Sequence, residues 1–452
     1  MTTGTEDPRT AEVDALFAPY DKPDSPGCAL AILQEGRTLY ERGYGMAILE
    51  YAIPITPETI FHVASISKQF TSFCIYLLAQ EGKLSLEDEV RKHLPELPDY
   101  GKSITLRHLV LHTSGLRDHW DLVRLAGWRM EDVITEDDLL SLIWKQRDLN
   151  FAPGAEYLYS NTGHTLLGVI VRRITGQSLR EFADAHIFRP LGMDHTHFHN
   201  DHQEIVPNRA YSYYPKGEGY AHSVLSFSNM GATSLFTTVR DLAKWDENFT
   251  TGQVGGKALL EEMQQKGRLN DNTEITYAGG LAITPYRGEM TVGHNGADAG
   301  FRSTIIRFPG PRFSVIILAN TANFDPATLA KRVADIYLAD RLAQEPETPA
   351  SQEQPPAEPL PPSSPLDEYA GDYYSEELGV FYSVLLREET LIARHKKGEC
   401  ALEPLSADSF RHAEFGKFHF QRNRRGRITG FMVDTGRIRA MPFRRSRVIP
   451  AR

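Results

Sequence analysis

Ser65 and Lys68 stand three residues apart, a spacing that could support nucleophilic catalysis. Apolar residues follow at helical spacing until Gly82, which predicts a buried helix over 65–81 with Ser65 at its mouth and Lys68 one turn later on the same face. A helix N-terminus offers unpaired N–H groups and a positive potential to a developing oxyanion. Burial lowers the pKa of a lysine, which would let Lys68 act as a base. The alternative is that Ser65 only caps the helix. The motif by itself is a weak signal, since an S-x-x-K is expected about once by chance in such a chain.

A second polar group follows a Pro-Gly turn in PGAEYLYSN, residues 153–161. Its end presents the Tyr159 phenol, the Ser160 hydroxyl and the Asn161 amide side by side, directly before a predicted helix over 162–174. A tyrosine here could relay protons if a neighbouring ammonium lowered its pKa. Taken alone, the loop would more simply hold a buried aromatic ring, with Asn161 as a helix cap.

A third group is GHNGAD, residues 293–298, at the edge of a strand predicted over 291–297. Glycines flank the pair His294-Asn295, and they would let a ligand approach the backbone of an edge strand closely. Taken alone, His294 would be a surface histidine with satisfied hydrogen bonds.

Strands at both ends of the first 345 residues must position these groups. Two hairpins are predicted, one from 28–34 and 37–44, the other from 301–308 and 313–320. With the strand over 291–297, five antiparallel strands could form one sheet.

Helices are predicted between and after these strands. One of them, over 178–188, opens with a capping box from Ser178 to Glu181. The last begins after the N-cap Asp325, with Pro326 at its first position. The predicted helices cover residues 65–81, 161–174, 178–188 and 326–342.

The C-terminal part has a different character. Residues 346–365 carry eight of the 27 prolines and no aromatic residue, which predicts an extended linker. Residues 366–452 hold short β-prone runs without helical periodicity, which indicates a small barrel or sandwich. These runs are 369–374, 380–387, 391–395, 415–422, 428–433 and 438–443. The sequence thus predicts an α+β domain over 1–345 (an antiparallel sheet flanked by helices plus a helical subdomain), a linker over 346–365 and a small all-β barrel over 366–452.

Composition excludes several classes of protein. Hydrophobic residues make up 41% and charged residues 24%, which is ordinary for a globular chain. The sequence has no run of 18 apolar residues, so we expect no membrane contacts. The N-terminus does not resemble a secretory signal, so we expect a cytoplasmic protein, although a trimmed secreted form would have the same sequence. The formal charge of −10 argues against a nucleic-acid partner. Residues 366–452 carry a net +4 and the remainder −14, as expected for two modules with different surfaces.

Other chemistries lack their motifs. The three cysteines, Cys28, Cys74 and Cys400, do not have metal-ligand spacing and are predicted to be structural thiols. The chain contains no G-x-S-x-G, no H-E-x-x-H and no P-loop sequence. We also expect no paired Cys/His cluster, and therefore no metal and no cofactor.

Taken together, the three polar groups resemble those of the serine β-lactamase and penicillin-binding-protein superfamily. S-x-x-K on a helix, Y-S-N on a loop and H-x-G on a late strand follow in the same order, as do longer segments such as ITLRHLVLHTSGL and IFRPLGM. The chain is most similar to the branch that includes class C β-lactamase-like esterases and D-aminopeptidases. The likeness spans roughly residues 25–340. The C-terminal β part is similar to the lipocalin-like barrel appended to some members.

The resemblance implies roles for particular residues. Ser65 would be the acylated nucleophile, and Lys68 and Tyr159 would share the work of general base and proton shuttle. Asn161 would bind a substrate amide or carbonyl. The strand that pairs with the substrate would include His294 and Gly296, and the backbone N–H groups of Ser65 and Ala297 would form the oxyanion hole. The HTSGL segment, residues 112–116, is expected to be structural.

His294 departs from the pattern of penicillin-recognising members, which have a lysine at this place. A mostly neutral imidazole, with Asp298 nearby, would attract a substrate carboxylate poorly. We therefore expect a small-molecule ester, small amide or peptide substrate cleaved through an acyl-enzyme on Ser65. A D-aminopeptidase whose barrel sends a loop toward the cleft is one alternative, and a catalytically silent ligand-binding or scaffold relative is another. The sequence does not determine the oligomeric state.

Overall fold

The computed structural model describes residues 7–344 and 365–446, and they form two compact units that each combine separate segments of the chain. Of the described residues, 7–89, 105–111 and 164–344 belong to the first unit, and 90–104, 112–163 and 365–446 to the second. The predicted linker lies outside the described residues except for Pro365, and the predicted domain boundaries stay a prediction.

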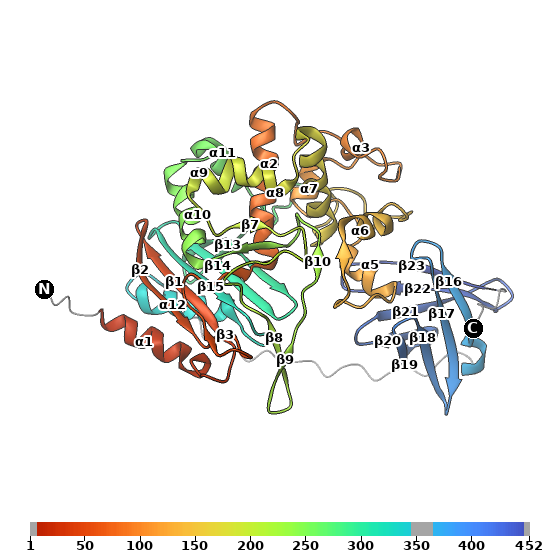
Figure 1. Ribbon diagram of the computed structural model, residues 1–452. Helices are drawn as coiled ribbons and strands as arrows, with labels where there is room; N and C mark the ends of the chain where they lie inside the picture. The colour runs from red at the N-terminus through yellow and green to blue at the C-terminus, as the bar shows by residue number, and fades with distance from the viewer. Residues whose placement is uncertain (1–6, 345–364, 447–452) are drawn as a thin grey trace, which may run out of the picture. The chain divides into compact units, whose positions relative to one another are not determined.

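An antiparallel sheet of six strands, in the order β12-β13-β14-β15-β1-β2, forms the centre of the first unit (Figure 1). The strands are β1 Cys28–Gln34, β2 Arg37–Tyr44, β12 Ala282–Tyr286, β13 Glu289–Asp298, β14 Phe301–Phe308 and β15 Phe313–Ala319. Both predicted hairpins are confirmed, and β1 joins the two ends of the unit by pairing with β15. The sequence did not predict β12, an edge strand that contains Pro285 and has no clear alternation.

Helices pack on this sheet, and β1 and β15 are buried almost throughout, which explains their uninterrupted apolar sequences. The helix α12 (Pro326–Tyr337) contacts β14 and β15, and α1 (Pro8–Phe17) packs against α12. The helix α10 (Val239–Thr251) contacts β1 and β15. As predicted, the Asp325 side chain caps α12 by accepting a hydrogen bond from the Thr328 N–H at 3.1 Å. The helix ends five residues before the predicted position 342.

A smaller sheet leads to the helix that carries Lys68. It consists of β5 (Phe61–His62), β11 (Leu235–Thr237) and β7 (His197–Phe198), in that order. From β5 the chain enters a 3₁₀ turn, Ala64–Ile66, and continues as α2 (Ser67–Gln80). The helix predicted over 65–81 is thus confirmed, but its first turn is wound more tightly.

The remaining elements of the first unit are short. The capping box at Ser178 is confirmed, since Ser178 and Glu181 exchange side-chain to backbone hydrogen bonds. The helix behind it turns into a π-helix at Asp184. The elements are η1 Ala18–Tyr20, β3 Met46–Ile48, β4 Ile53–Pro54, α4 Leu106–Val110, α8 Leu179–Ala183, η3 Asp184–Phe188, α9 Arg189–Leu191, β8 Tyr213–Lys216, β9 Gly219–His222, β10 Phe227–Ser228 and α11 Gly256–Met263.

A closed antiparallel barrel of eight strands dominates the second unit. The strands are β16 Gly371–Ser375, β17 Val380–Arg387, β18 Thr390–His395, β19 Gly398–Ser406, β20 Ser409–His412, β21 Gly416–Arg422, β22 Ile428–Asp434 and β23 Met441–Arg445. The predicted barrel is confirmed. Two strands, β19 and β20, were missed because β19 is polar and bulges near Pro404. Aromatic rings fill the interior, among them Tyr373, Tyr382, Phe431 and Phe443.

Residues 112–163 pack on the barrel within the same unit. A buried ion pair joins Arg117 to Glu377 at 2.6 Å, and the Tyr382 hydroxyl donates a hydrogen bond to the Leu125 carbonyl at 2.9 Å. The other elements are α3 Val90–His93, α5 His119–Leu125, β6 Ile134–Thr135, α6 Glu136–Ile143 and η4 Leu366–Tyr369, and α7 (Asn161–Thr175) begins in this unit and continues in the first. In the part of the chain that the structure describes, no helix combines the length and the apolar character needed to cross a bilayer.

Candidate active site

Ser65 lies within the 3₁₀ turn that precedes α2. The N-cap position of α2 is Ile66 and has no side-chain cap, so the alternative that Ser65 merely caps this helix is wrong. The residue before it, Ala64, has a φ of +47°, a strained conformation for a residue with a Cβ. Backbone strain of this kind is found mainly at functional sites, where it holds a neighbouring side chain, here that of Ser65, in a fixed position. Ser65 is half-buried, between residues that are fully buried.

Lys68 is fully buried and lies against the Ser65 hydroxyl. Its Nζ donates hydrogen bonds to the Ser65 Oγ at 3.0 Å and to the Ala232 carbonyl at 2.7 Å. A base within hydrogen-bond distance of a serine hydroxyl is the arrangement that activates a nucleophile. The structure therefore brings Ser65 and Lys68 together as predicted.

The segment 231–235 holds the start of α2 in place. The Thr71 hydroxyl donates to the Gly231 carbonyl at 2.8 Å, and the Leu235 N–H donates to the Ser67 Oγ at 3.0 Å. Gly231 has a φ of +103°, and a Cβ there would lie 2.3 Å from the His164 carbonyl oxygen. This segment was not predicted, although the glycine at position 231 was a signal for a close approach of two backbones.

His294 on β13 is buried beside Lys68 and Tyr277. A carbonyl can only accept, so the 2.6 Å contact between Nδ1 and the Asn295 carbonyl means that Nδ1 carries the proton. The Nε2 atom then accepts a hydrogen bond from the Tyr277 hydroxyl at 2.9 Å. Burial lowers the pKa of His294 to about 4, which makes it neutral at pH 7. Tyr277 was not predicted.

Gly296 brings β13 close to the turn that carries Ser65. A Cβ at this position would lie 2.3 Å from the Val63 carbonyl oxygen and 2.3 Å from the Ser303 hydroxyl. β13 pairs with β12 only from Glu289 to Gly293. The rest of β13, from His294 to Asp298 and including Ala297, continues beyond the end of β12. The Asp298 carboxylate accepts a hydrogen bond from the Thr233 hydroxyl at 2.8 Å.

Asn161 and Tyr159 belong to the second unit, where a buried carboxylate positions Asn161. Oδ2 of Asp118 accepts the Asn161 backbone N–H at 2.6 Å and its side-chain amide at 2.7 Å. Burial alone would raise the pKa of Asp118, but the charges of His119 and Arg437 and the hydrogen bonds from Asn161 hold it below its usual value. The amide of Asn161 is thereby oriented through Asp118, which sequence reasoning missed.

Tyr159 packs against the HTSGL segment. Its ring centroid lies 4.3 Å from that of His112, whose Nδ1 accepts the Ser160 N–H at 3.2 Å. His112 has a φ of +57°. The expectation that HTSGL is a structural segment is consistent with these contacts, because His112 shapes the loop that carries Tyr159.

A loop of the barrel also reaches Tyr159. It connects β22 to β23, and the Arg437 guanidinium carbon lies 5.2 Å from the centroid of the Tyr159 ring. The same guanidinium lies 3.7 Å from Oδ2 of Asp118. Arg439 forms a two-pronged ion pair with Glu156, at 3.0 and 2.8 Å. The barrel thus contributes a cation to the surroundings of Tyr159.

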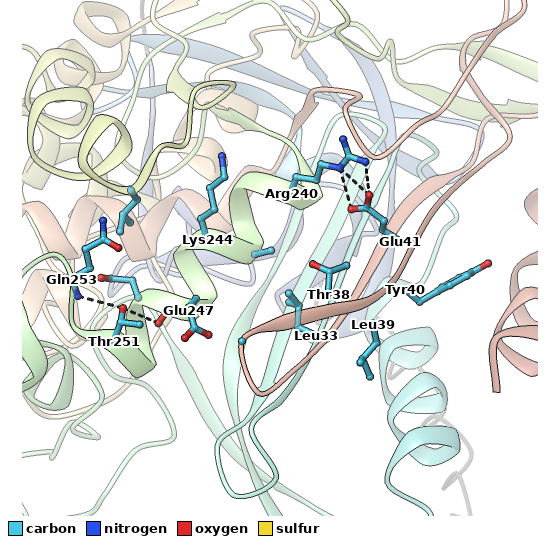
Figure 2. Close-up of a pocket in the computed structure, with 14 residues that line it drawn as sticks. Leu33, Thr38, Leu39, Tyr40, Glu41, Arg240, Lys244, Glu247, Thr251 and Gln253 are labelled. Atoms are coloured by element: carbon cyan, nitrogen blue, oxygen red, sulfur yellow. Dashed lines mark hydrogen bonds and ion pairs between the residues drawn. The ribbon is translucent and has the colours of Figure 1, made fainter. Parts of the chain in front are cut away.

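A separate cavity of about 720 Å³ lies between β2 and α10 in the first unit (Figure 2). Its charged residues include Arg240, which pairs with Glu41, as well as Lys244 and Glu247. None of the predicted site residues lines it. The first unit therefore brings Ser65, Lys68, His294 and Gly296 into one neighbourhood, whereas Tyr159 and Asn161 lie in the second.

Comparison with known proteins identifies the family. Residues 13–338 match the model of the Beta-lactamase family. The chain is 29% identical over 343 residues to penicillin-binding protein 4* of Bacillus subtilis, covering 71% of this chain and 74% of that protein. It is 29% identical over 341 residues to a D-aminopeptidase of Gluconobacter oxydans, covering 74% of this chain and 64%, less than two thirds, of that protein.

A solved structure shares the fold over most of the chain. The octameric penicillin-binding protein homologue from Pyrococcus abyssi superposes with a TM-score of 0.64 at 24% identity, covering 94% of this chain and 96% of that one. This likeness shows the fold alone. The family match extends over well more than half of the sequence, and the chain belongs to the Beta-lactamase family.

Proposed function

We propose that the protein is a serine hydrolase that forms an acyl-enzyme on Ser65. The observation that carries the proposal is the 3.0 Å hydrogen bond from the buried Nζ of Lys68 to the Ser65 hydroxyl. A serine with a purely structural role does not need a buried lysine beside its hydroxyl. A nucleophilic serine, in contrast, needs a base at hydrogen-bond distance. The intact contact also argues against a catalytically silent relative.

The proposed reaction has two halves. In acylation, Lys68 in its neutral form accepts the proton of Ser65 while Oγ attacks the substrate carbonyl, and Tyr159 relays that proton. The backbone N–H groups of Ser65 and Ala297 stabilise the oxyanion, and the proton passes to the leaving alcohol or amine. In deacylation, a water molecule gives up a proton to Lys68 and attacks the ester carbonyl. The bond to the Ser65 Oγ then breaks, the proton returns to Oγ, and the product acid leaves. Asn161 would bind the substrate amide or carbonyl, and the strand with His294 and Gly296 would pair with the substrate.

The substrate class follows from the charges around these residues. His294 is neutral at pH 7, so it does not supply the cation that a penicillin carboxylate needs. We therefore propose an ester or a small amide as substrate. The second candidate is a D-aminopeptidase, supported by the D-aminopeptidase of Gluconobacter oxydans among the relatives. Arg437 beside Tyr159 opposes it, because a guanidinium repels a free substrate ammonium.

The test is the mass of the intact protein after brief exposure to a p-nitrophenyl ester, followed by peptide mapping. We expect one acyl group on Ser65 that disappears with time, and release of p-nitrophenol. The variants Ser65→Ala and Lys68→Ala should lose both signals, whereas the exposed control Ser141→Ala should keep them. Stable ester turnover in Ser65→Ala would overturn the proposal, and the absence of both adduct and product would favour a ligand-binding role.

A further inference from the structure

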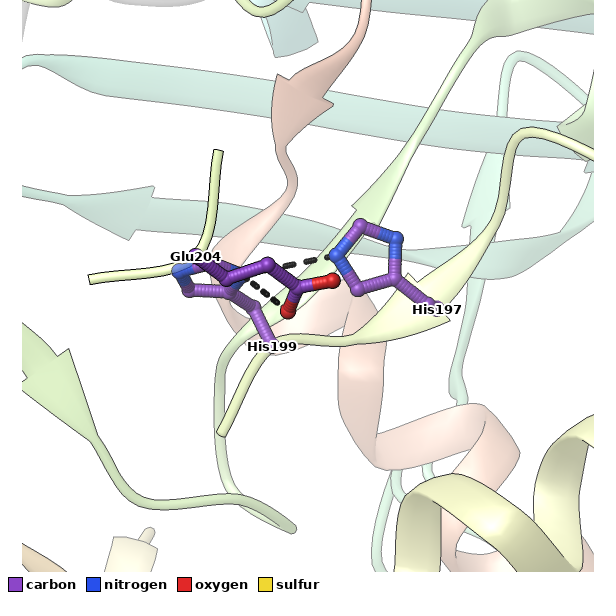
Figure 3. A group of neighbouring side chains, drawn as sticks. All are labelled: His197, His199 and Glu204. Carbon is purple, nitrogen blue, oxygen red and sulfur yellow. Dashed lines mark hydrogen bonds and ion pairs between the residues drawn. The ribbon is translucent and has the colours of Figure 1, made fainter. Parts of the chain in front are cut away.

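Two histidines and a glutamate of the first unit, none of them among the residues proposed for hydrolysis, lie close together. They are His197 on β7, His199 directly after it and Glu204 in the following loop. Figure 3 shows the two imidazole rings and the carboxylate turned toward one another. This cluster was not predicted, although the H-x-H spacing at 197 and 199 was a signal for it.

The distances in this cluster suit metal ligands better than hydrogen bonds. The Nε2 atom of His197 lies 3.4 Å from Nδ1 of His199, and Nδ1 of His199 lies 3.5 Å from Oε2 of Glu204. An N–H hydrogen bond is usually about 2.7–3.2 Å long. Two ligand atoms at about 2.0–2.2 Å from one tetrahedral ion lie about 3.3–3.6 Å apart. The three ligand atoms all lie within 4.8 Å of one another, so a single ion can contact all of them.

We propose that His197, His199 and Glu204 bind one Zn²⁺ ion. Two imidazole nitrogens and one carboxylate oxygen form a ligand set that suits Zn²⁺, with a water molecule as the fourth ligand. Ca²⁺ and Mg²⁺ are disfavoured because they prefer oxygen ligands. The ion takes no direct part in the proposed chemistry at Ser65.

The surroundings decide how strongly the ion would bind. His199 is buried and His197 is half-buried, and each imidazole offers one ring nitrogen to the ion. Arg180 holds Glu204 by two hydrogen bonds, of 2.5 and 2.8 Å. Each carboxylate oxygen keeps a further lone pair, so Arg180 can remain as an outer partner that orients the ligand. The charges of Arg180 and Arg209 oppose a cation, and we therefore expect moderate affinity.

The position of the cluster indicates what the ion would stabilise. The backbone pairs His197 with Phe236 of β11, and Phe236 with His62 of β5, the strand that leads to Ser65. The His199 N–H donates to the Ser234 carbonyl at 2.7 Å. An ion held by Glu204 would fasten the loop after β7 to this sheet. It is thus a structural ion that supports the turn carrying Ser65.

The experiment uses the full chain, treated with a chelator and then titrated with Zn²⁺ in a calorimeter. We expect one ion per chain, bound with moderate affinity, and a rise of several degrees in Tm at a Zn²⁺ concentration about 100-fold above the dissociation constant. His197→Ala and His199→Ala should each lose both effects. The matched control His195→Ala removes an exposed histidine two residues away and should retain them. Absence of binding, or binding that persists equally in both ligand variants, would overturn the proposal.

A second measurement covers the case in which a histidine variant does not fold. Glu204→Gln leaves both histidines in place and replaces the only carboxylate ligand, so it should weaken Zn²⁺ binding at least tenfold. X-ray absorption at the zinc edge of the native chain should show two imidazole ligands. An edge spectrum with one or no imidazole ligand would contradict the assignment.

Discussion

The guanidinium of Arg437 lies over the ring of Tyr159, with 5.2 Å between the guanidinium carbon and the ring centroid. The arginine comes from a loop of the C-terminal barrel, and the tyrosine from the loop that precedes α7. The barrel is therefore part of the environment of a residue proposed to move protons. We therefore expect the barrel to influence the choice of substrate.

Replacing Arg437 by alanine should change selectivity. Loss of the cation is expected to lower kcat/KM about three- to tenfold for an ester with a carboxylate near the scissile bond, and to raise it for a D-amino-acid amide with a free amine. The measurement is kcat/KM for both substrates at low and high salt, since salt should reduce the difference. Arg439→Ala, which removes the partner of Glu156, is the matched control. Equal effects on both substrates would contradict a charge-reading role for Arg437.

A methyl group at Gly296 should impair the site. In Gly296→Ala the added Cβ would meet the Val63 carbonyl and the Ser303 hydroxyl at 2.3 Å, so β13 must move away from the turn before Ser65. We expect a loss of about 1–3 kcal/mol of stability and at least a tenfold loss of kcat/KM for an activated ester. Gly219→Ala is the control, because nothing lies within 4 Å of a Cβ there. Similar kcat/KM values in the two variants would show that the close approach is unimportant.

Asp118 should be essential for the shape of the Asn161 loop. Asp118→Ala leaves the N–H groups of Asn161 without their acceptor, and we expect a loss of about 2–4 kcal/mol in the free energy of unfolding, measured in urea. Because its pKa is lowered in the folded protein, Asp118 contributes stability above about pH 4, and this contribution is lost as the pH falls through the folded pKa. Asp118→Asn, which keeps the volume and one oxygen acceptor, should be less damaging. An alanine variant as stable as the native chain would refute this role.

His294 should make the protein less stable in acid. Its pKa is about 4 in the folded protein, compared with about 6.5 in an unfolded chain. Between these values the unfolded chain binds a proton that the folded protein does not, so the free energy of unfolding falls as the pH decreases from 7 to 4, by up to about 3 kcal/mol from this residue. His294→Asn should flatten this dependence, and the exposed control His195→Asn should not. Parallel pH profiles for His294→Asn and the native chain would contradict the assignment.

Local patterns were sufficient for much of this protein. The apolar run after Ser65, the two hairpins and the capping box at Ser178 depend on contacts between residues close in sequence, and all of them are present in the structure. The elements that were missed lack such patterns. The strands β12 and β19 contain a proline and are partly polar, and their neighbours hold them in the sheet.

The sequence by itself determined the residues proposed for nucleophilic catalysis, their order and the elements that carry them, because helical and strand periodicities are local properties. Only the tertiary structure decided which distant residues these groups contact. Ala232 accepts a hydrogen bond from Lys68, and Asp118 holds Asn161. Arg437 lies over Tyr159, and Glu204 lies beside His197 and His199. Those contacts join residues far apart in the chain or in loops without periodicity. They follow from how buried polar groups find partners in the packed fold, which no local pattern specifies.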